Sequence, residues 1–249
     1  MQFKSGVITL IDKLEYNDEY AAEVTRHGKY DEHLEAQTPD ITLVTCSDSR
    51  VLEKCLDDEI GKIFSIKNIG NRVMPNLGSI EYGTGFLKTP LLIILGHTGC
   101  GAIHASMSDI SNEHTHVTKS LESIRPTAAN IQKLIIRKGG IAGYMKEHLP
   151  NPDSHISEQD YLETLVTEAN VDRQVDILLD DEPIRKLVYD GKLMIIGAIY
   201  DFKDIYSPRR GSIFIINVNG ETDVNKLKVV DFLSDERLIT DRMKRLLQY

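Results

Sequence analysis

Short apolar runs alternate with longer, partly polar segments along the chain. Five of these runs are rich in Ile, Leu and Val and end at polar or glycine residues, which is typical of buried strands. The five predicted strands cover residues 41–45, 63–67, 91–95, 193–199 and 212–217. Strands that alternate with helical segments favour an α/β fold with a short, largely parallel sheet flanked by helices.

The segments between the strands have apolar residues at helical spacing, which predicts helices. Residues 7–36 are mostly polar and predict one or two surface helices, whereas residues 157–180 predict one long amphipathic helix. The shorter predicted helices cover residues 51–56, 77–88, 120–137 and 233–248. Residues 106–160 contain patches of Ser, Asn and His and give the weakest pattern.

The composition is that of a globular protein with one sizeable core. The chain has 249 residues, of which 41% are hydrophobic and 27% charged, a size that suits a single α/β domain. Asp and Glu outnumber Lys and Arg by 38 to 29, which gives a net charge of −9. Without a cluster of basic residues, neither nucleic acid nor an anionic membrane is an expected partner.

The cysteines and the apolar runs bear on the cellular location of the protein. Three cysteines do not make a disulfide framework, and an odd number suits a reducing compartment. The first ten residues lack the long apolar run of a signal peptide, and the apolar runs elsewhere are much shorter than the ~20 residues that cross a bilayer. We therefore expect a cytoplasmic protein.

Candidate metal ligands follow two of the predicted strands. Cys46 directly follows the first strand, and His97 and Cys100 follow the third. Because ligands bind beyond the carboxyl ends of parallel strands, these two loops are where chemistry is expected. Two thiols and one imidazole are a common zinc set that leaves a fourth position open, as catalytic sites do, and thiolates favour zinc over magnesium or calcium. The alternative is two ordinary buried cysteines and a hydrogen-bonded histidine, since spacing alone does not prove that the three meet.

A charged pair lies in the first of these loops. Asp48 and Arg50 are two residues apart, and one interpretation is an ion pair that stabilises the turn. The other is functional, because an aspartate so close to a zinc ligand is itself attracted to the metal. Bidentate contact with Arg50 would hold Asp48 away from the metal and leave it as a hydrogen-bond acceptor beside the open position.

The polar loops together resemble three motifs of the β-class carbonic anhydrases. The motifs are Cys-Ser-Asp-Ser-Arg at 46–50, Lys-Asn-Ile-Gly-Asn at 67–71 and His-Thr-Gly-Cys-Gly at 97–101. The resemblance continues through Asn170-Val171 and Gln174 to Gly197-Ala198-Ile199-Tyr200-Asp201, so it covers most of the chain. It implies a short parallel sheet flanked by helices and a single domain over residues 1–249, with an N-terminal helical arm (1–36) and an extended insertion (106–168).

The resemblance also implies the activity, a lyase that reversibly hydrates carbon dioxide to bicarbonate and a proton through zinc-bound hydroxide. One Zn²⁺ per chain would be held by Cys46, His97 and Cys100, with Asp48 and Arg50 as the catalytic dyad. Two alternatives remain open at this point. The same scaffold and ligands resemble carbonyl sulfide and carbon disulfide hydrolases, and a zinc-binding module without turnover would also use them.

Three further residues match pocket positions of plant-type members of this family. Gln37, which is followed by Thr38-Pro39, is expected to line the substrate pocket, as are Phe64 and Tyr82. Their ordinary alternatives are a loop residue for Gln37 and a core aromatic for Phe64. In the family an N-terminal helical arm embraces a second subunit, and pocket residues come from both chains. The resemblance therefore implies a homodimer or a higher homo-oligomer.

Overall fold

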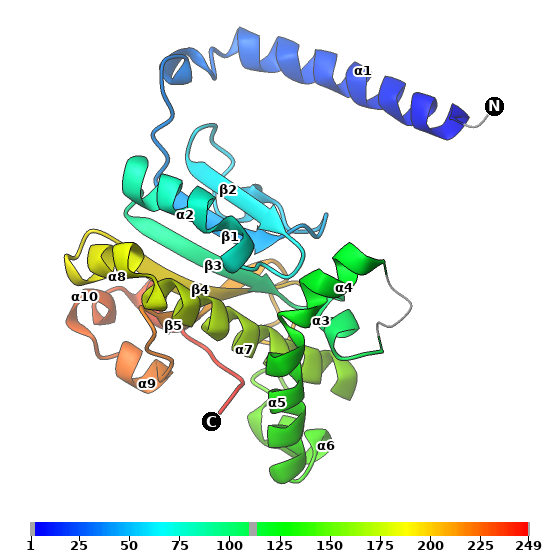
Figure 1. Cartoon of the computed structure of the whole chain (residues 1–249), viewed down its shortest axis with the longest axis vertical. Coiled ribbons are helices and arrows are strands. Elements are labelled where there is room, and N and C mark those ends of the chain that lie inside the picture. The colour runs from blue at the N-terminus through cyan, green and yellow to red at the C-terminus, as the bar shows by residue number, and fades with distance from the viewer. Residues whose placement is uncertain (1–2, 110–113, 249) are drawn as a thin grey trace.

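The computed structural model describes residues 3–109 and 114–248. At its centre is a five-stranded sheet with the order β2-β1-β3-β4-β5 (Figure 1). The strands are β1 (Ile41–Cys46), β2 (Ile63–Asn68), β3 (Leu91–His97), β4 (Met194–Asp201) and β5 (Ser212–Val218). The first four in the sheet order run parallel and β5 runs antiparallel to β4, which confirms the mainly parallel sheet and all five predicted strands.

Helices cover both faces of this sheet, as a parallel sheet requires. Successive residues of β3 point to opposite faces, so that Leu92 and Ile94 join one core cluster and Ile93 and Leu95 the other. The first face is covered by α3 (Gly101–Ser106), α5 (Arg125–Arg137), α6 (Ile141–His148), α7 (Glu158–Asp180) and α8 (Glu182–Tyr189). The second face carries η2 (Glu53–Cys55), α9 (Val224–Leu227), α10 (Asp231–Ser234) and α11 (Arg237–Arg242).

The helix α7 lies directly against β3 and β4. A Cβ atom added at Gly96 or at Gly197 would come within 2.8 Å of Val171, so the two bare glycine backbones permit this close approach. The helix spans the predicted residues, and it is amphipathic in its C-terminal part, where Arg173, Asp176 and Asp180 are exposed. From Glu163 to Asp172 its outer side is buried as well, because α5, α6 and the C-terminal residues pack over it.

The N-terminal segment forms a single long helix, α1 (Lys4–Arg26), followed by the short turn η1 (Asp31–His33). Figure 1 shows α1 projecting away from the rest of the molecule. Within this fully described helix, Val24 alone is buried. The helix exposes a row of apolar side chains at Val7, Ile8, Leu10, Ile11 and Leu14.

The predicted helix over residues 233–248 is wrong beyond Arg242. The chain there becomes extended, and Met243 forms a bridge with Ile215 of β5. The amides of Leu246 and Leu247 donate hydrogen bonds to the buried carboxylate of Glu168 at 2.9 and 2.7 Å. These tertiary hydrogen bonds replace the helical ones, and both leucine side chains are buried.

The remaining segments follow the predictions in part. Residues 51–56 contain the three-residue turn η2 instead of a helix, and residues 77–88 divide into α2 (Leu77–Glu81) and the π-helical turn η4 (Tyr82–Phe86), with the turn η3 (Met74–Asn76) before them. The weakly patterned region is helical, because α4 (Thr115–Glu122), α5 and α6 lie within it; its residues 110–113 lie outside the described residues. None of the helices in the described ranges is long and apolar enough to cross a lipid bilayer.

Candidate metal centre

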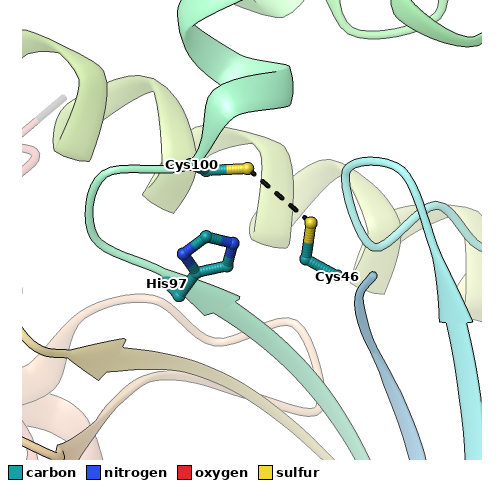
Figure 2. Close-up of side chains that lie close together, drawn as sticks. All are labelled: Cys46, His97 and Cys100. Atoms are coloured by element: carbon teal, nitrogen blue, oxygen red, sulfur yellow. Dashed lines mark hydrogen bonds between the residues drawn. The ribbon is translucent and has the colours of Figure 1, made fainter. Parts of the chain in front are cut away.

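Three predicted ligand residues converge at the carboxyl ends of β1 and β3 (Figure 2). Cys46 is the last residue of β1, His97 is the last residue of β3, and Cys100 immediately precedes α3. The two Sγ atoms are 4.0 Å apart, and one potential ligand atom from each residue lies within 4.8 Å of the others. All three residues are buried. They meet because β1 and β3 are parallel neighbours in the sheet, so that their carboxyl ends share one edge.

The geometry of the three side chains fits a zinc ion. Two sulfurs bound to a tetrahedral zinc at ~2.3 Å are about 3.8 Å apart, whereas a disulfide would bring them to ~2.05 Å. The observed 4.0 Å agrees with the former. The Nδ1 atom of His97 lies 3.1 Å from the carbonyl oxygen of Thr98, which accepts its hydrogen. The other ring nitrogen, Nε2, is buried and finds no hydrogen-bond partner among the described residues, so its lone pair is available to a metal.

The two thiols differ in their pKa values. A hydrogen bond joins the two sulfurs, and this bond is the main reason why the pKa of Cys46 is lowered to about 4. Burial opposes this shift, while His97 and the backbone N–H of Gly70 support it. The same bond and burial raise the pKa of Cys100. One thiolate, the form that binds metal, is therefore favoured before any ion arrives.

Asp48 and Arg50 form a bidentate pair beside the ligands. Arg50 donates from Nε to Oδ1 of Asp48 at 2.9 Å and from Nη2 to Oδ2 at 2.7 Å, and the Arg50 amide donates to Oδ1 at 3.0 Å. The Arg50 hydrogen bonds hold the pKa of Asp48 well below its usual range. Oδ2 of Asp48 lies 3.9 Å from Nε2 of His97, so the carboxylate borders the place where the ligand atoms converge.

The Arg50 side chain also joins the two ligand loops. Its Nη2 atom donates a second hydrogen bond, of 3.0 Å, to the carbonyl oxygen of Gly99. Gly99 lies between the two ligands of the β3 loop and has a φ of +64°, a conformation that glycine adopts readily. A Cβ atom there would come within 2.7 Å of the Lys203 side chain. Glycine therefore suits the turn that presents this carbonyl group to Arg50.

The motif at residues 67–71 supports Cys46 through contacts with α7. The carbonyl oxygen of Gly70 accepts a hydrogen bond of 3.1 Å from Asn170, and the amide of Val73 donates one of 2.8 Å to Gln174. Gln174 in turn donates to Asn170 at 3.2 Å, and both amide side chains are buried. These hydrogen bonds fix the loop whose Gly70 amide faces the Cys46 sulfur. The resemblance through Asn170 and Gln174 was the sequence signal for it, although not for its role.

Phe202 is a residue of the site that the sequence analysis missed. Its ring stacks on the His97 ring with centroids 5.4 Å apart, and the Cζ atom of Arg50 lies 4.5 Å from its centroid. It follows the last residue of β4, the neighbour of β3 in the sheet. A phenylalanine after a strand is ordinarily read as part of the core, so the pattern gave no signal for this position.

The three predicted pocket residues lie away from this chain's own metal centre. Phe64 is paired in register with Thr42, near the amino end of β1, and its ring lies 5.8 Å from that of Tyr82. Gln37 is exposed in the segment that precedes β1. Since a strand rises ~3.3 Å per residue, the amino end of β1 is about 16 Å from Cys46. The structure therefore brings the ligands and the Asp48–Arg50 pair together, but not these three.

Comparisons with known proteins agree with this geometry. Residues 41–206, more than half of the chain, match the family model described as carbonic anhydrase. A carbonic anhydrase of Mycolicibacterium smegmatis is 35% identical over 114 residues, which cover 43% of this chain and 52% of that protein. Carbonic anhydrase 2 of Mycobacterium tuberculosis is 29% identical over 175 residues, which cover 68% of this chain and 72% of that protein. This chain thus spans about half the length of the first relative and more than two thirds of the second.

A solved structure shows the same fold. One of the tetrameric β-carbonic anhydrases of the filamentous ascomycete Sordaria macrospora has a TM-score of 0.66 to this chain, with 84% of this chain and 97% of that chain covered. The identity is 21%, so this likeness is one of fold. The family match over most of the core and the shared fold together confirm the predicted family and its enzyme class. The chain belongs to the β-class carbonic anhydrase family.

Proposed function

We propose that the protein reversibly hydrates carbon dioxide to bicarbonate and a proton, with one Zn²⁺ per chain held by Cys46, His97 and Cys100. The observation that carries this proposal is the convergence of three buried ligand atoms, including an unpartnered imidazole nitrogen, beside a bidentate aspartate–arginine pair. Family membership supports it. When bound, zinc would lower the pKa of water to about 7 and so supply a nucleophile near neutral pH.

Asp48 would orient the reacting water. Arg50 keeps this carboxylate ionised, because its hydrogen bonds hold the pKa of Asp48 well below neutral pH. An ionised carboxylate only accepts hydrogen bonds, so Asp48 would accept the hydrogen of the attacking oxygen and direct a lone pair of that oxygen toward carbon dioxide. Both of its own oxygens are held by Arg50, which opposes a shift of Asp48 onto the metal.

Stopped-flow measurement of carbon dioxide hydration by the zinc-loaded protein tests the proposed function. We expect hydration at pH 7 as well as at pH 9, because Asp48 is ionised and held by Arg50 at both values. Hydration at pH 9 alone would contradict this expectation of a nucleophile at neutral pH. Hydrolysis of carbonyl sulfide without hydration of carbon dioxide would contradict the proposed substrate.

We further propose that a second copy of the chain completes the substrate pocket with its Gln37, Phe64 and Tyr82. The position of these residues near the amino ends of β1 and β2 supports this, since they lie too far from the chain's own ligands to line that site. Tyr82 and Phe86 stack on each other with 41% and 71% of their surfaces exposed, an aromatic surface suited to a partner. The Sordaria relative is tetrameric, which is consistent with a homo-oligomer.

A mixed dimer tests this arrangement. Gln37→Leu is expected to lower kcat/KM about 10-fold through loss of one hydrogen bond to bicarbonate, and His97→Asn should abolish activity. The two variants are co-expressed with different tags and purified together as one dimer. That dimer should show about half of the wild-type activity, because one of its two sites combines intact ligands with an intact Gln37 from the partner. A dimer of wild-type and His97→Asn chains is the matched control and should show the same activity.

A much lower activity of the mixed dimer would contradict this arrangement. If Gln37 serves its own chain, the mixed dimer has no intact site, and its activity should not exceed the mean of the two variants.

We also propose that residues 1–249 act as one domain, with residues 1–36 as the arm toward the partner and residues 106–168 as an insertion. A cytoplasmic location is proposed as well; it is supported by the three cysteines, all described and all free.

A further inference from the structure

Phe202 joins three loops at the carboxyl edge of the sheet. Its ring contacts His97 at the end of β3 and Arg50 in the loop after β1, while Phe202 itself follows β4. Its amide donates a hydrogen bond of 3.1 Å to Oγ1 of Thr98, the residue that follows His97. The backbone and the ring of Phe202 are therefore both attached to the segment that carries two of the candidate zinc ligands.

The two contacts of the ring are chemically different. The His97 ring is stacked on it with an angle of 29° between the planes, which restricts rotation of the imidazole about its side-chain bonds. The Arg50 guanidinium lies over it as a cation over an aromatic face, which restricts the group that holds Asp48. A flat, rigid side chain is needed for both contacts, and an aliphatic one of similar size provides neither.

Phe202 also lines a neighbouring cavity. A cavity of about 390 Å³ is lined by Phe202 together with Asn151, Asp160 and Lys203, among others. If the ring were replaced by a narrower side chain, His97 and Arg50 would gain space, because both pack against it. The ring thus restrains both His97 and Arg50.

We propose that Phe202 is a positioning residue, whose ring fixes the His97 imidazole and the Arg50 guanidinium relative to each other. The metal ligand and the group that orients the reacting water are then held as one unit. The kinetic part of this inference rests on the proposed function, whereas the part that concerns zinc affinity does not. Phe202 does not itself touch the place where the three ligand atoms converge, and it acts through His97 and Arg50.

The test compares Phe202→Leu and Phe202→Met, which remove the aromatic face, with Phe202→Tyr, which keeps it. The full-length variants are measured for zinc affinity by competition with a chelator and for kcat and KM. The visible spectrum of the Co²⁺-substituted proteins reports the geometry around the ion. Residues that orient a metal ligand typically contribute 10–100-fold, so we expect Phe202→Leu and Phe202→Met to lose about 10-fold in zinc affinity and in kcat/KM. The cobalt spectrum should change in both, and Phe202→Tyr should resemble the wild type.

Phe214→Leu is the matched control. Phe214 is also stacked on an aromatic ring, that of Tyr206, and it also has a guanidinium over it, with the Arg242 Cζ atom 5.6 Å from its centroid. It lies on β5, and its ring contacts belong to Tyr206, Arg242 and Lys244 instead of to the metal centre. This variant should lower the melting temperature and leave zinc affinity and the cobalt spectrum unchanged.

The outcomes separate the inference from the proposed function. Unchanged zinc affinity, cobalt spectrum and kcat/KM in Phe202→Leu or Phe202→Met would overturn the inference. So would equal losses in Phe202→Tyr, or a loss of zinc affinity in Phe214→Leu of the same size. If the wild type hydrated no carbon dioxide while Phe202→Leu still weakened zinc binding and altered the cobalt spectrum, the proposed function would be wrong and the inference would stand.

Discussion

The Cys46→Ser protein is expected to be purified without stoichiometric zinc and to hydrate carbon dioxide no faster than the uncatalysed reaction. Cys46 supplies one of the two sulfurs in the group, and the hydrogen bond between the two sulfurs lowers its pKa, which favours the thiolate that binds metal. A serine hydroxyl in its place would be neutral and a much weaker ligand. Without the metal, nothing lowers the pKa of water far enough to supply a nucleophile at neutral pH.

Cys55→Ser is the control for this variant. Cys55 is half-buried in the turn η2 and lies outside the metal group, and burial raises the pKa of its thiol. We expect this protein to retain one zinc per chain and the wild-type kcat/KM. Zinc content is measured by elemental analysis under reducing conditions. Stoichiometric zinc in Cys46→Ser, or an equal loss in Cys55→Ser, would contradict the assignment of the ligands.

Asp48→Asn is expected to keep its zinc and to lose most of its activity. The amide cannot carry the negative charge that Arg50 stabilises, and it offers one acceptor oxygen in place of two. Proton-handling groups of this kind contribute about 100-fold to 10,000-fold, and we expect the loss in kcat/KM to lie in that range. Because the pKa of Asp48 is well below neutral pH, the wild-type carboxylate stays ionised between pH 6 and pH 9, and no pH in that interval should make the two proteins equal.

Asp204→Asn provides the comparison, since Asp204 also pairs with an arginine, Arg210, at 2.8 Å but lies outside the metal group. It should hydrate carbon dioxide at the wild-type rate. If Asp48→Asn retained full activity with zinc bound, the proposed role of the pair of Asp48 and Arg50 would be wrong. If it lost zinc as well, Asp48 would act on metal binding instead of on the reacting water.

The sheet and the candidate metal ligands could be predicted from the sequence for a physical reason. A strand buried on both faces reads as a continuous apolar run, and 91–95 is such a run. Parallel strands then bring their carboxyl ends to one edge, so that Cys46 and His97 could be expected to meet although they are far apart in the chain. The bidentate contact of Asp48 with Arg50 follows from their short separation, and it fits both a pair that stabilises the turn and the functional interpretation.

Other features depend on tertiary contacts that local patterns do not encode. Residues 243–248 have the composition of a helix end, but Met243 forms a bridge with β5, and the amides of Leu246 and Leu247 donate to Glu168, which is distant in sequence. Phe202 joins His97 and Arg50 only because of the direction in which the chain leaves β4. The resemblance supplied Gln37, Phe64 and Tyr82 as pocket residues, but only the sheet shows that they lie at the edge away from the chain's own ligands.

Because α7 lies so close to the sheet, substitutions outside the metal centre can disrupt it. Any side chain at Gly96 or Gly197 would push against Val171, which directly follows Asn170 in the helix. Displacing this part of α7 would withdraw the amide groups that secure the loop beside Cys46. In a survey of inactivating substitutions, we therefore expect these two glycines to rank with the proposed zinc ligands. Substitutions at the glycines would inactivate the protein because packing space is lost, and not because a reacting group is removed.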